Sequence, residues 1–199
     1  MMNVEEAKRF AEKHFPNGPE ELARKLGILV LESPLVGCDG WVLTGSAGLI
    51  IRLNSNNAST RRRFTLAHEL AHLLLEIPTV VGESVLDSLQ SDSAEERRVN
   101  DLAGELLLPE DIVRDSLPSV PIVAKQLRKL AKSANVSELA AAIRVANLAK
   151  TIGLVNASVT CFLNDEFQWN YSKTLKMPST LAASLLNQAK EADPQAVRI

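Results

Sequence analysis

The chain has 199 residues, of which 46% are hydrophobic and 23% are charged. These shares are close to the averages of globular proteins and exclude a chain that is disordered throughout, while the length excludes a large multidomain assembly. Lys and Arg total 22 against 24 Asp and Glu, a net charge of -2. No chain-wide basic field therefore favours nucleic acid or anionic membranes, and any such contact must be local.

Residues 1–15 predict a charged helix rather than a targeting segment. Asn3 can cap this helix, Glu5 and Glu6 lie in its first turn, and it should end near Pro16. No later segment reaches the roughly 18 consecutive apolar residues that indicate a membrane span. A chain of this size with two cysteines needs no disulfide framework. We therefore expect a cytoplasmic protein without a membrane segment.

A small sheet and two further helices are predicted between residues 19 and 76. Residues 19–26 form a short helix, and three apolar runs predict strands at 28–31, 41–45 and 48–53. Thr60 is the expected N-cap of a helix over residues 61–76, which contain neither Gly nor Pro. We expect strand 48–53 to lie at an edge of the sheet, where it could hold an extended peptide by strand addition.

The chain downstream of residue 93 is mainly helical in pattern. Ser93 can cap a helix over residues 94–108, and a short helix should follow Pro109 to about residue 116. Pro118 and Pro121 indicate a boundary between a first domain over residues 1–118 and a second region over residues 119–199.

The second region combines a helix-turn-helix shape with a β-hairpin. Its predicted elements are helices 122–132 and 137–150, strands 154–163 and 166–171, and a last helix at 179–191. The expected fold class is therefore α+β: a mainly helical domain with a small sheet, followed by a helix-turn-helix-like segment and a hairpin.

The helix predicted over residues 61–76 contains the pattern HExxH, from His68 to His72. At 100° per residue the two histidines lie about 40° apart on one face, so both imidazoles can reach one metal ion, with Glu69 beside them. Two unrelated core histidines are the simpler interpretation. However, this helix is apolar nearly all round, and burying such groups without a partner costs several kcal/mol. We therefore predict one Zn2+ per chain, with Glu69 as the general base of peptide hydrolysis.

A third protein ligand is expected from the helix over residues 94–108. Glu95 and Glu96 lie about 50° on either side of the centre of its apolar face, so helix geometry alone does not separate them. Glu105 lies about 130° away and should be solvated or paired with an arginine.

The segments RRRFTLAHELAHLLLE and EERRVNDLAGELLLP resemble the two signatures of the ImmA/IrrE family of zinc metallopeptidases. The resemblance extends loosely over residues 1–115 and implies a zincin-like fold. It also implies that Glu96, four residues before Asn100, is the third zinc ligand. The activity it implies is an endopeptidase of narrow specificity that cleaves an XRE-type helix-turn-helix repressor encoded nearby and so relieves repression of a stress, mobile-element or defence operon. The chain has Ala103-Gly104 where the family usually has two alanines, and this difference does not alter a metal-ligand position.

Residues 122–152 are locally basic, with six Lys and Arg against the single acid Glu138. In a helix-turn-helix shape this segment would contact DNA, and the alternative is a two-helix cap whose lysines face water. The predicted nucleic-acid contacts are Lys125, Arg128, Lys129, Lys132 and Arg144. The run of three arginines at 61–63 is expected to be a solvated helix start, or to pair with carboxylates, rather than to bind nucleic acid.

Cys38, in the loop before the second strand, is a candidate inhibitory zinc ligand, because a thiolate can take the position of the catalytic water. The alternative is a half-buried loop cysteine without such a role, and Cys161 is expected in the core. Two functions besides the peptidase fit the sequence. One is a DNA-binding transcriptional regulator with a structural or degenerate zinc site, and the other is a toxin or antitoxin partner that acts by binding alone. Glu69 separates the peptidase from both, because only hydrolysis requires its carboxylate.

Overall fold

The computed structural model describes residues 2–45, 48–78, 93–117, 124–153, 159–163, 166–171 and 178–192. Its internal contacts divide the chain into two compact units. The N-terminal unit comprises residues 1–112 and 133–137, and the C-terminal unit comprises residues 113–132 and 138–199. The domain limits expected from the sequence, 1–118 and 119–199, stay a prediction.

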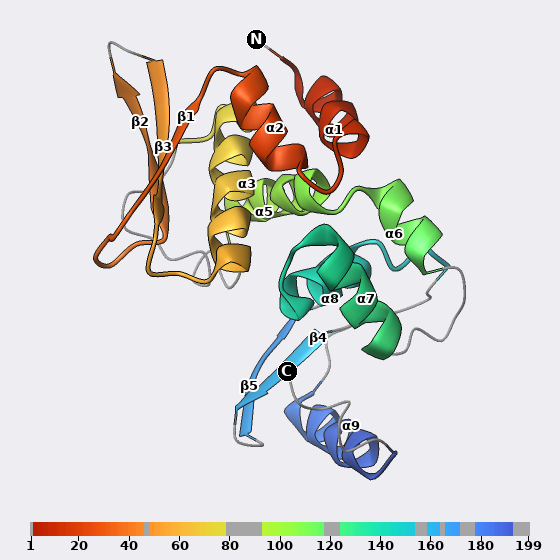
Figure 1. The fold of residues 1–199 in the computed structure, drawn as a ribbon. Helices are drawn as coiled ribbons and strands as arrows, with labels where there is room; N and C mark the ends of the chain where they lie inside the picture. Colours follow the sequence, from red (N-terminus) through yellow and green to blue (C-terminus); the bar gives the residue numbers. More distant parts are fainter. Residues whose placement is uncertain are drawn as a thin grey trace. The chain divides into compact units, whose positions relative to one another are not determined.

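The N-terminal unit is α+β, as predicted (Figure 1). Asn3 caps the first helix through a capping box with Glu6, which confirms the expected helix start. The elements are α1 (Val4–Lys13), α2 (Gly18–Lys25), β1 (Leu29–Ser33), β2 (Gly40–Gly45), β3 (Gly48–Asn54), α3 (Ser59–Leu75) and α5 (Ala94–Leu107), followed by α6 (Glu110–Ser116), whose residues belong partly to each unit.

The three strands form a mixed sheet in the order β1-β3-β2. β3 pairs with β1 in parallel and with β2 in an antiparallel hairpin, so it is the central strand. The prediction that this strand lies at an edge and takes up a peptide is therefore wrong, because both of its sides are already hydrogen-bonded. The parallel pairing of β1 with β3, in which Leu29 lies opposite Ile50, places β3 at the centre. These residues are far apart in the sequence, so local patterns do not predict their pairing.

α3 packs against β2 and β3 on one side and against α5 on the other. The inward side chains of β3, Ile51 and Leu53, are buried against it. Gly40 allows the close approach of β2, because a Cβ at this position would lie 2.7 Å from Cγ2 of Thr65. The helix that carries HExxH is thus held on two sides by packed structure.

α3 begins two residues earlier than the sequence predicts. Its N-cap is Ala58, whose carbonyl accepts hydrogen bonds from the amides of Arg61 and Arg62, and no side chain caps the helix. Thr60 therefore lies inside the first turn, and its prediction as the N-cap is wrong.

The arginine run at the start of α3 pairs with carboxylates, which confirms that interpretation over a nucleic-acid patch. The pairs are Arg61 with Asp39 (2.8 Å), Arg62 with Glu32 (3.1 Å) and Arg63 with Glu20 (2.7 Å). The first pair is bidentate, since Nε of Arg61 also donates to the other oxygen of Asp39 at 2.9 Å.

Arg63 is a buried cation, only 5% exposed. Besides Glu20, its guanidinium donates hydrogen bonds to the carbonyls of Pro16, Ala134 and Asn135. It thus joins α3 to the segment after α1 and to residues 133–137, all within the N-terminal unit.

The C-terminal unit contains the predicted helices and hairpin. The elements are α7 (Ala124–Ala134, whose last two residues belong to the N-terminal unit), α8 (Glu138–Asn147), β4 (Val159–Leu163), β5 (Glu166–Tyr171) and α9 (Ser179–Ala192). β4 and β5 pair in antiparallel fashion. The first part of the predicted strand 154–163 and most of the predicted loop 77–93 lie outside the described residues.

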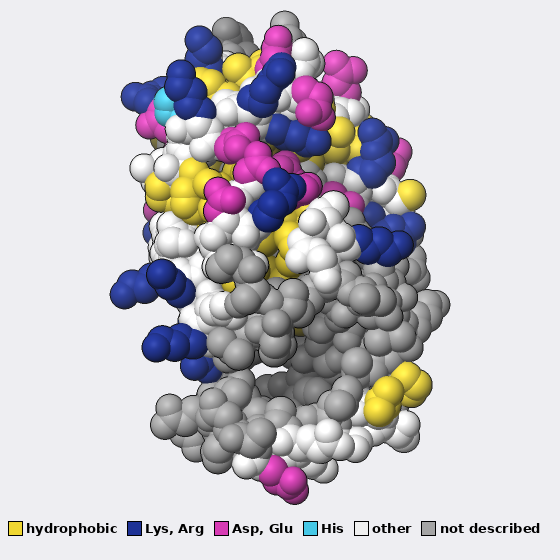
Figure 2. All heavy atoms as spheres, turned by 90° about the vertical axis from the view of Figure 1, so that its right-hand side faces the viewer, with side chains coloured by type: hydrophobic (Ala, Val, Ile, Leu, Met, Phe, Trp, Pro, Cys, Tyr) yellow, Lys and Arg dark blue, Asp and Glu magenta, His cyan; other side chains and the backbone are white. Residues whose placement is uncertain are grey.

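The helices and the surface charges can be compared with the expectations from the sequence. Over the described part of the chain, every helix is too short or too polar to cross a bilayer. Figure 2 shows acidic and basic side chains interspersed over the coloured part of the face it presents. This mixture matches the near balance of 22 basic and 24 acidic residues.

Candidate metal centre

Two neighbouring helices supply the side chains of the candidate site. His68 and His72 project from α3, and Glu96 from the first turn of α5, whose N-cap Ser93 accepts a hydrogen bond from the Glu96 amide. All three side chains are buried, whereas the neighbouring Glu95 is exposed. The structure therefore separates the two glutamates that helix geometry alone left open.

The ligand atoms of these three residues converge. Nε2 of His68 lies 3.1 Å from Nε2 of His72, and the two oxygens of Glu96 lie 3.7 Å and 3.6 Å from these nitrogens. Among the described residues, this is the group of His, Cys, Asp and Glu ligand atoms that could hold one metal ion.

The outer nitrogens of both imidazoles determine what the inner nitrogens can do. Nδ1 of His68 lies 3.1 Å from Oδ1 of Asn100, and Nδ1 of His72 lies 3.1 Å from the carbonyl oxygen of Ile77. Both neighbours are hydrogen-bond acceptors when the amide of Asn100 is oriented this way, so each Nδ1 must carry the proton. A neutral imidazole then has a bare lone pair on Nε2, and the two lone pairs face each other and a carboxylate.

Burial favours this neutral state of His68. Desolvation, followed by the neighbouring His72, lowers the pKa of His68 to about 4. The imidazole is therefore neutral near neutral pH, with Nε2 free of a proton, as a metal ligand must be.

The arrangement fits a tetrahedral cation. Ligand atoms bound at about 2.0 to 2.1 Å from such an ion lie about 3.3 to 3.4 Å from each other, and the observed separations of 3.1 to 3.7 Å bracket this value. Three buried acceptor atoms that face one another repel, and a cation bound among them would remove this repulsion. His68, His72 and Glu96 could thus hold one metal ion with two nitrogen ligands and one carboxylate.

Glu69 lies in the same buried turn of α3 and is 4% exposed. It follows His68 directly, so its side chain leaves the helix about 100° further round and does not belong to the ligand group. A buried carboxylate beside the ligands, and outside their number, is what a general base for an attacking water requires.

Sequence reasoning missed two groups that orient the imidazoles. Glu76 takes a left-handed conformation (φ 56°) at the C-cap of α3, which turns the chain so that the Ile77 carbonyl meets His72. Asn100 reaches His68 from α5. Its place in the second signature, one turn after Glu96, was visible in the sequence, but its role depends on how the two helices cross.

Asn100 should contribute strongly to metal affinity. Replacing it by leucine removes the acceptor that holds Nδ1–H of His68 and releases the ring, which we expect to weaken metal binding by about 10- to 100-fold. Competition with a fluorescent chelator measures this affinity. Asn100→Asp, which keeps an acceptor at the same position, should retain most of it, and equal losses in both variants would contradict the orienting role.

The remaining predicted site residues are not members of this ligand group. Cys38 is half-buried in the β1–β2 loop, where its carbonyl accepts a hydrogen bond from the side chain of Asn54, and it is not among the clustered ligands. Glu105 accepts a hydrogen bond from the amide of Glu110. The predicted nucleic-acid contacts divide into exposed side chains on α7, a half-buried Arg128 paired with Glu138, and a buried Arg144; the exposed ones are Lys125, Lys129 and Lys132.

The chain is similar in sequence to known proteins and in fold to a solved structure. The family model described as Peptidase_M78, IrrE N-terminal-like domain, matches residues 23–146. The radiation response metalloprotease IrrE of Deinococcus deserti is 34% identical over 95 residues, covering 46% of this chain and 34% of that protein. Its counterpart in Deinococcus radiodurans is 32% identical over 91 residues, covering 44% of this chain and 28% of that protein.

The alignments thus cover about a third of the length of these curated relatives. Among solved structures, a Mycobacterium tuberculosis transcriptional regulator matches with a TM-score of 0.58 and 15% identity, over 88% of this chain and 56% of that one. At this identity the likeness concerns the fold alone.

Proposed function

Because the chain belongs to the Peptidase_M78 metalloprotease family with an IrrE N-terminal-like domain, we propose that it is a zinc-dependent endopeptidase of narrow specificity. The observation that carries the proposal is the convergence of His68, His72 and Glu96 within one buried site, with Glu69 beside it. Two imidazoles and one carboxylate are a ligand set typical of catalytic zinc, which leaves a fourth position open.

Different groups of the chain would have different roles in peptide hydrolysis. Zinc, when bound, supplies a Lewis acid that polarises the peptide carbonyl and makes water more acidic. Glu69 accepts a proton from the attacking water and delivers it to the leaving amine, so its carboxylate acts first as a base and then as an acid. Asn100 and the Ile77 carbonyl keep both imidazoles oriented with Nε2 inward.

The proposed substrate is an XRE-type helix-turn-helix repressor encoded near this gene. The two matched Deinococcus proteins are named for a radiation response, which supports a role in regulating a stress operon; mobile-element and defence operons are the other settings that the sequence resemblance implies. Cleavage is tested by incubating the zinc-loaded protein with the neighbouring repressor and recording intact masses. Two fragments whose masses sum to that of the repressor plus one water would support the proposal, and an uncleaved repressor would contradict its choice as the substrate.

Zinc content should depend on Glu96 and not on Glu95. We expect about one zinc per purified chain, lost or strongly reduced in Glu96→Ala, because two imidazoles alone hold the ion weakly. Elemental mass spectrometry measures this. Glu95→Ala is the matched control, since its side chain is exposed on the same turn. A chain that binds no zinc even when loaded, or two variants with the same content, would contradict the site.

A local DNA contact through residues 122–152 is a second proposal. Lys125, Lys129 and Lys132 are exposed and recur with helical spacing along α7, and such a basic stripe can track phosphates. Changing all three to glutamine should weaken binding to operator DNA and lower the slope of log K against log salt by about three. Fluorescence anisotropy over a salt series measures both, and an unchanged slope favours the solvated cap.

In the alternative that the sequence leaves open, a DNA-binding regulator with a structural zinc site, this contact would persist in Glu69→Gln.

A further inference from the structure

Among the described elements of the N-terminal unit, helices contact one face of the sheet and none contacts the other. α3 contacts β2 and β3, and α2 contacts β1, all on the same side (Figure 1). On the opposite side, the strand register places two rows of side chains across the three strands. This outer sheet face comprises Leu29, Ile50 and Leu43 in one row, and Leu31, Arg52 and Trp41 in the next.

The outer sheet face is apolar where a solvent-exposed face is usually polar. Leu29 is 53% exposed, Leu31 36% and Leu43 49%. These three leucines are among the five large hydrophobic residues that are exposed in the described part of the chain. A sheet with one solvated face normally alternates apolar and polar residues. Here both faces of β1 and β3 carry aliphatic side chains, and contiguous apolar surface of this kind typically indicates an interaction site.

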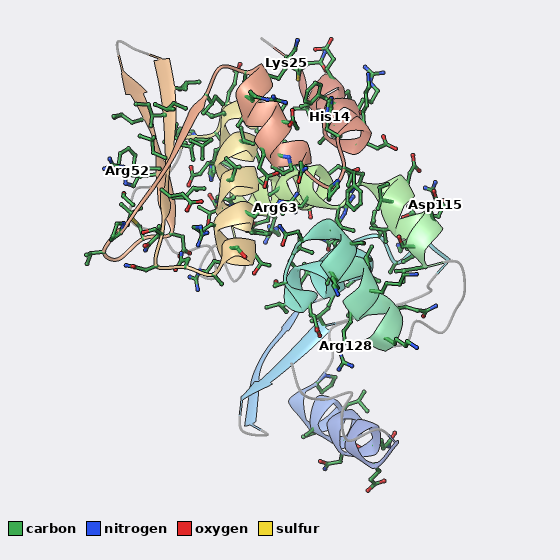
Figure 3. All side chains as sticks on the ribbon, in the orientation of Figure 1. His14, Lys25, Arg52, Arg63, Asp115 and Arg128 are labelled. Carbon is green, nitrogen blue, oxygen red and sulfur yellow. The ribbon has the colours of Figure 1, made fainter. Side chains whose placement is uncertain are left out.

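A single charged group lies within the outer sheet face. Arg52 points away from α2 and α3 (Figure 3), and its guanidinium carbon lies 5.4 Å from the centre of the Trp41 ring. Nε of Arg52 is buried and has no hydrogen-bond partner among the described residues. The three arginines of α3 all pair with carboxylates, whereas Arg52 has no carboxylate within ion-pair distance in the described part of the chain.

This charge pattern distinguishes between occupants. A second copy stacked face to face would bring Arg52 close to its own equivalent about the two-fold axis, with no carboxylate on the face to separate them. Nucleic acid would need several cations, while this face offers one cation among four aliphatic side chains. An acidic side chain flanked by apolar ones satisfies both the cation and the leucines.

We propose that the outer sheet face is a docking site for a segment of a partner protein in which an Asp or Glu is flanked by aliphatic side chains. The acid pairs with Arg52 beside Trp41, and the aliphatic side chains cover Leu29, Leu31 and Leu43. Because the sheet lies between this face and α3, which carries two of the metal ligands, docking requires neither bound zinc nor cleavage. The inference therefore stands independently of the proposed peptidase function.

The test selects ligands without assuming their identity. A library of displayed 12-residue peptides is panned on Glu69→Gln protein, which cannot consume them, after depletion on the same protein carrying Arg52→Glu. We expect the enriched peptides to share an acidic residue among aliphatic ones. Synthetic versions should bind at least about tenfold more weakly to Arg52→Gln than to the parent, by fluorescence anisotropy.

Charge reversal provides the decisive control. Peptides whose acid is changed to Lys should bind Arg52→Glu protein and not the parent, which also shows that the variant is folded. Lys25→Glu, an exposed charge reversal on α2, should leave binding of the original peptides unchanged. Failure to enrich any peptide, enriched peptides without an acid, or equal binding to all variants would overturn the proposal. So would dimerisation or oligonucleotide binding that is lost in Arg52→Gln.

Discussion

Replacing Glu69 by glutamine is expected to abolish cleavage while leaving the zinc content unchanged. The substitution keeps the shape of a side chain that is 4% exposed but removes its ability to accept a proton. Loss of a general base typically costs about 10²- to 10⁴-fold in rate. The rate is measured as single-turnover appearance of repressor fragments, beside the zinc content of the same preparation.

The paired measurement separates the competing functions. Glu96→Ala should lose both zinc and cleavage, whereas Glu69→Gln should lose cleavage alone. If Glu69→Gln protein instead relieves repression as well as the parent does, the chain acts by binding, and the regulator or the toxin and antitoxin alternatives would replace the peptidase.

Replacing Arg63 by methionine is expected to destabilise the N-terminal unit strongly, although the residue lies outside the metal site. The variant leaves the carbonyls of Pro16, Ala134 and Asn135 without their shared donor. Hydrogen bonds from a charged group are worth about 1.5 to 3 kcal/mol each, but Glu20 is 43% exposed on its side chain and can be rehydrated. The variant also no longer buries a charge, which offsets part of the loss of the three bonds. We therefore expect a net loss of about 3 kcal/mol, or about 6 to 12 °C in Tm.

Thermal unfolding followed by circular dichroism checks this value. The matched control is Arg24→Met, because Arg24 pairs with Glu21 on the surface and its side chain is 75% exposed. Such pairs contribute about 0 to 1 kcal/mol, so the control should melt close to the parent. Similar melting of both variants would mean that the buried hydrogen bonds of Arg63 contribute little.

The parts of the site that were predictable from the sequence are those encoded within one helix. His68 and His72 lie one turn apart, so their common face follows from helix geometry alone. Glu96 was reached only through the family resemblance, because its distance to the histidines depends on how α5 crosses α3. For the same reason the role of Asn100 was not anticipated, and the Ile77 carbonyl depends on one backbone turn at Glu76.

The sheet shows the same limit. The three strands were located correctly because apolar runs and turn residues are local signals. The edge position expected for strand 48–53 was wrong, because the parallel pairing of β1 with β3 joins distant segments. Local patterns likewise did not indicate that Arg63 would be enclosed by carbonyls from residues 134 and 135.

The hydrogen bonds from Arg63 to the carbonyls of residues 134 and 135 affect when the N-terminal unit can fold during protein synthesis. Arg63 and Asn135 are separated by 72 positions, which a ribosome adds in about 4 to 14 s at roughly 5 to 20 residues per second. All three metal ligands are translated before that interval ends. The guanidinium of Arg63, however, lacks the carbonyls of Ala134 and Asn135 until these residues have been added. The N-terminal unit therefore completes its folding only after α7 has been translated, and the maturation of the two units is coupled in time.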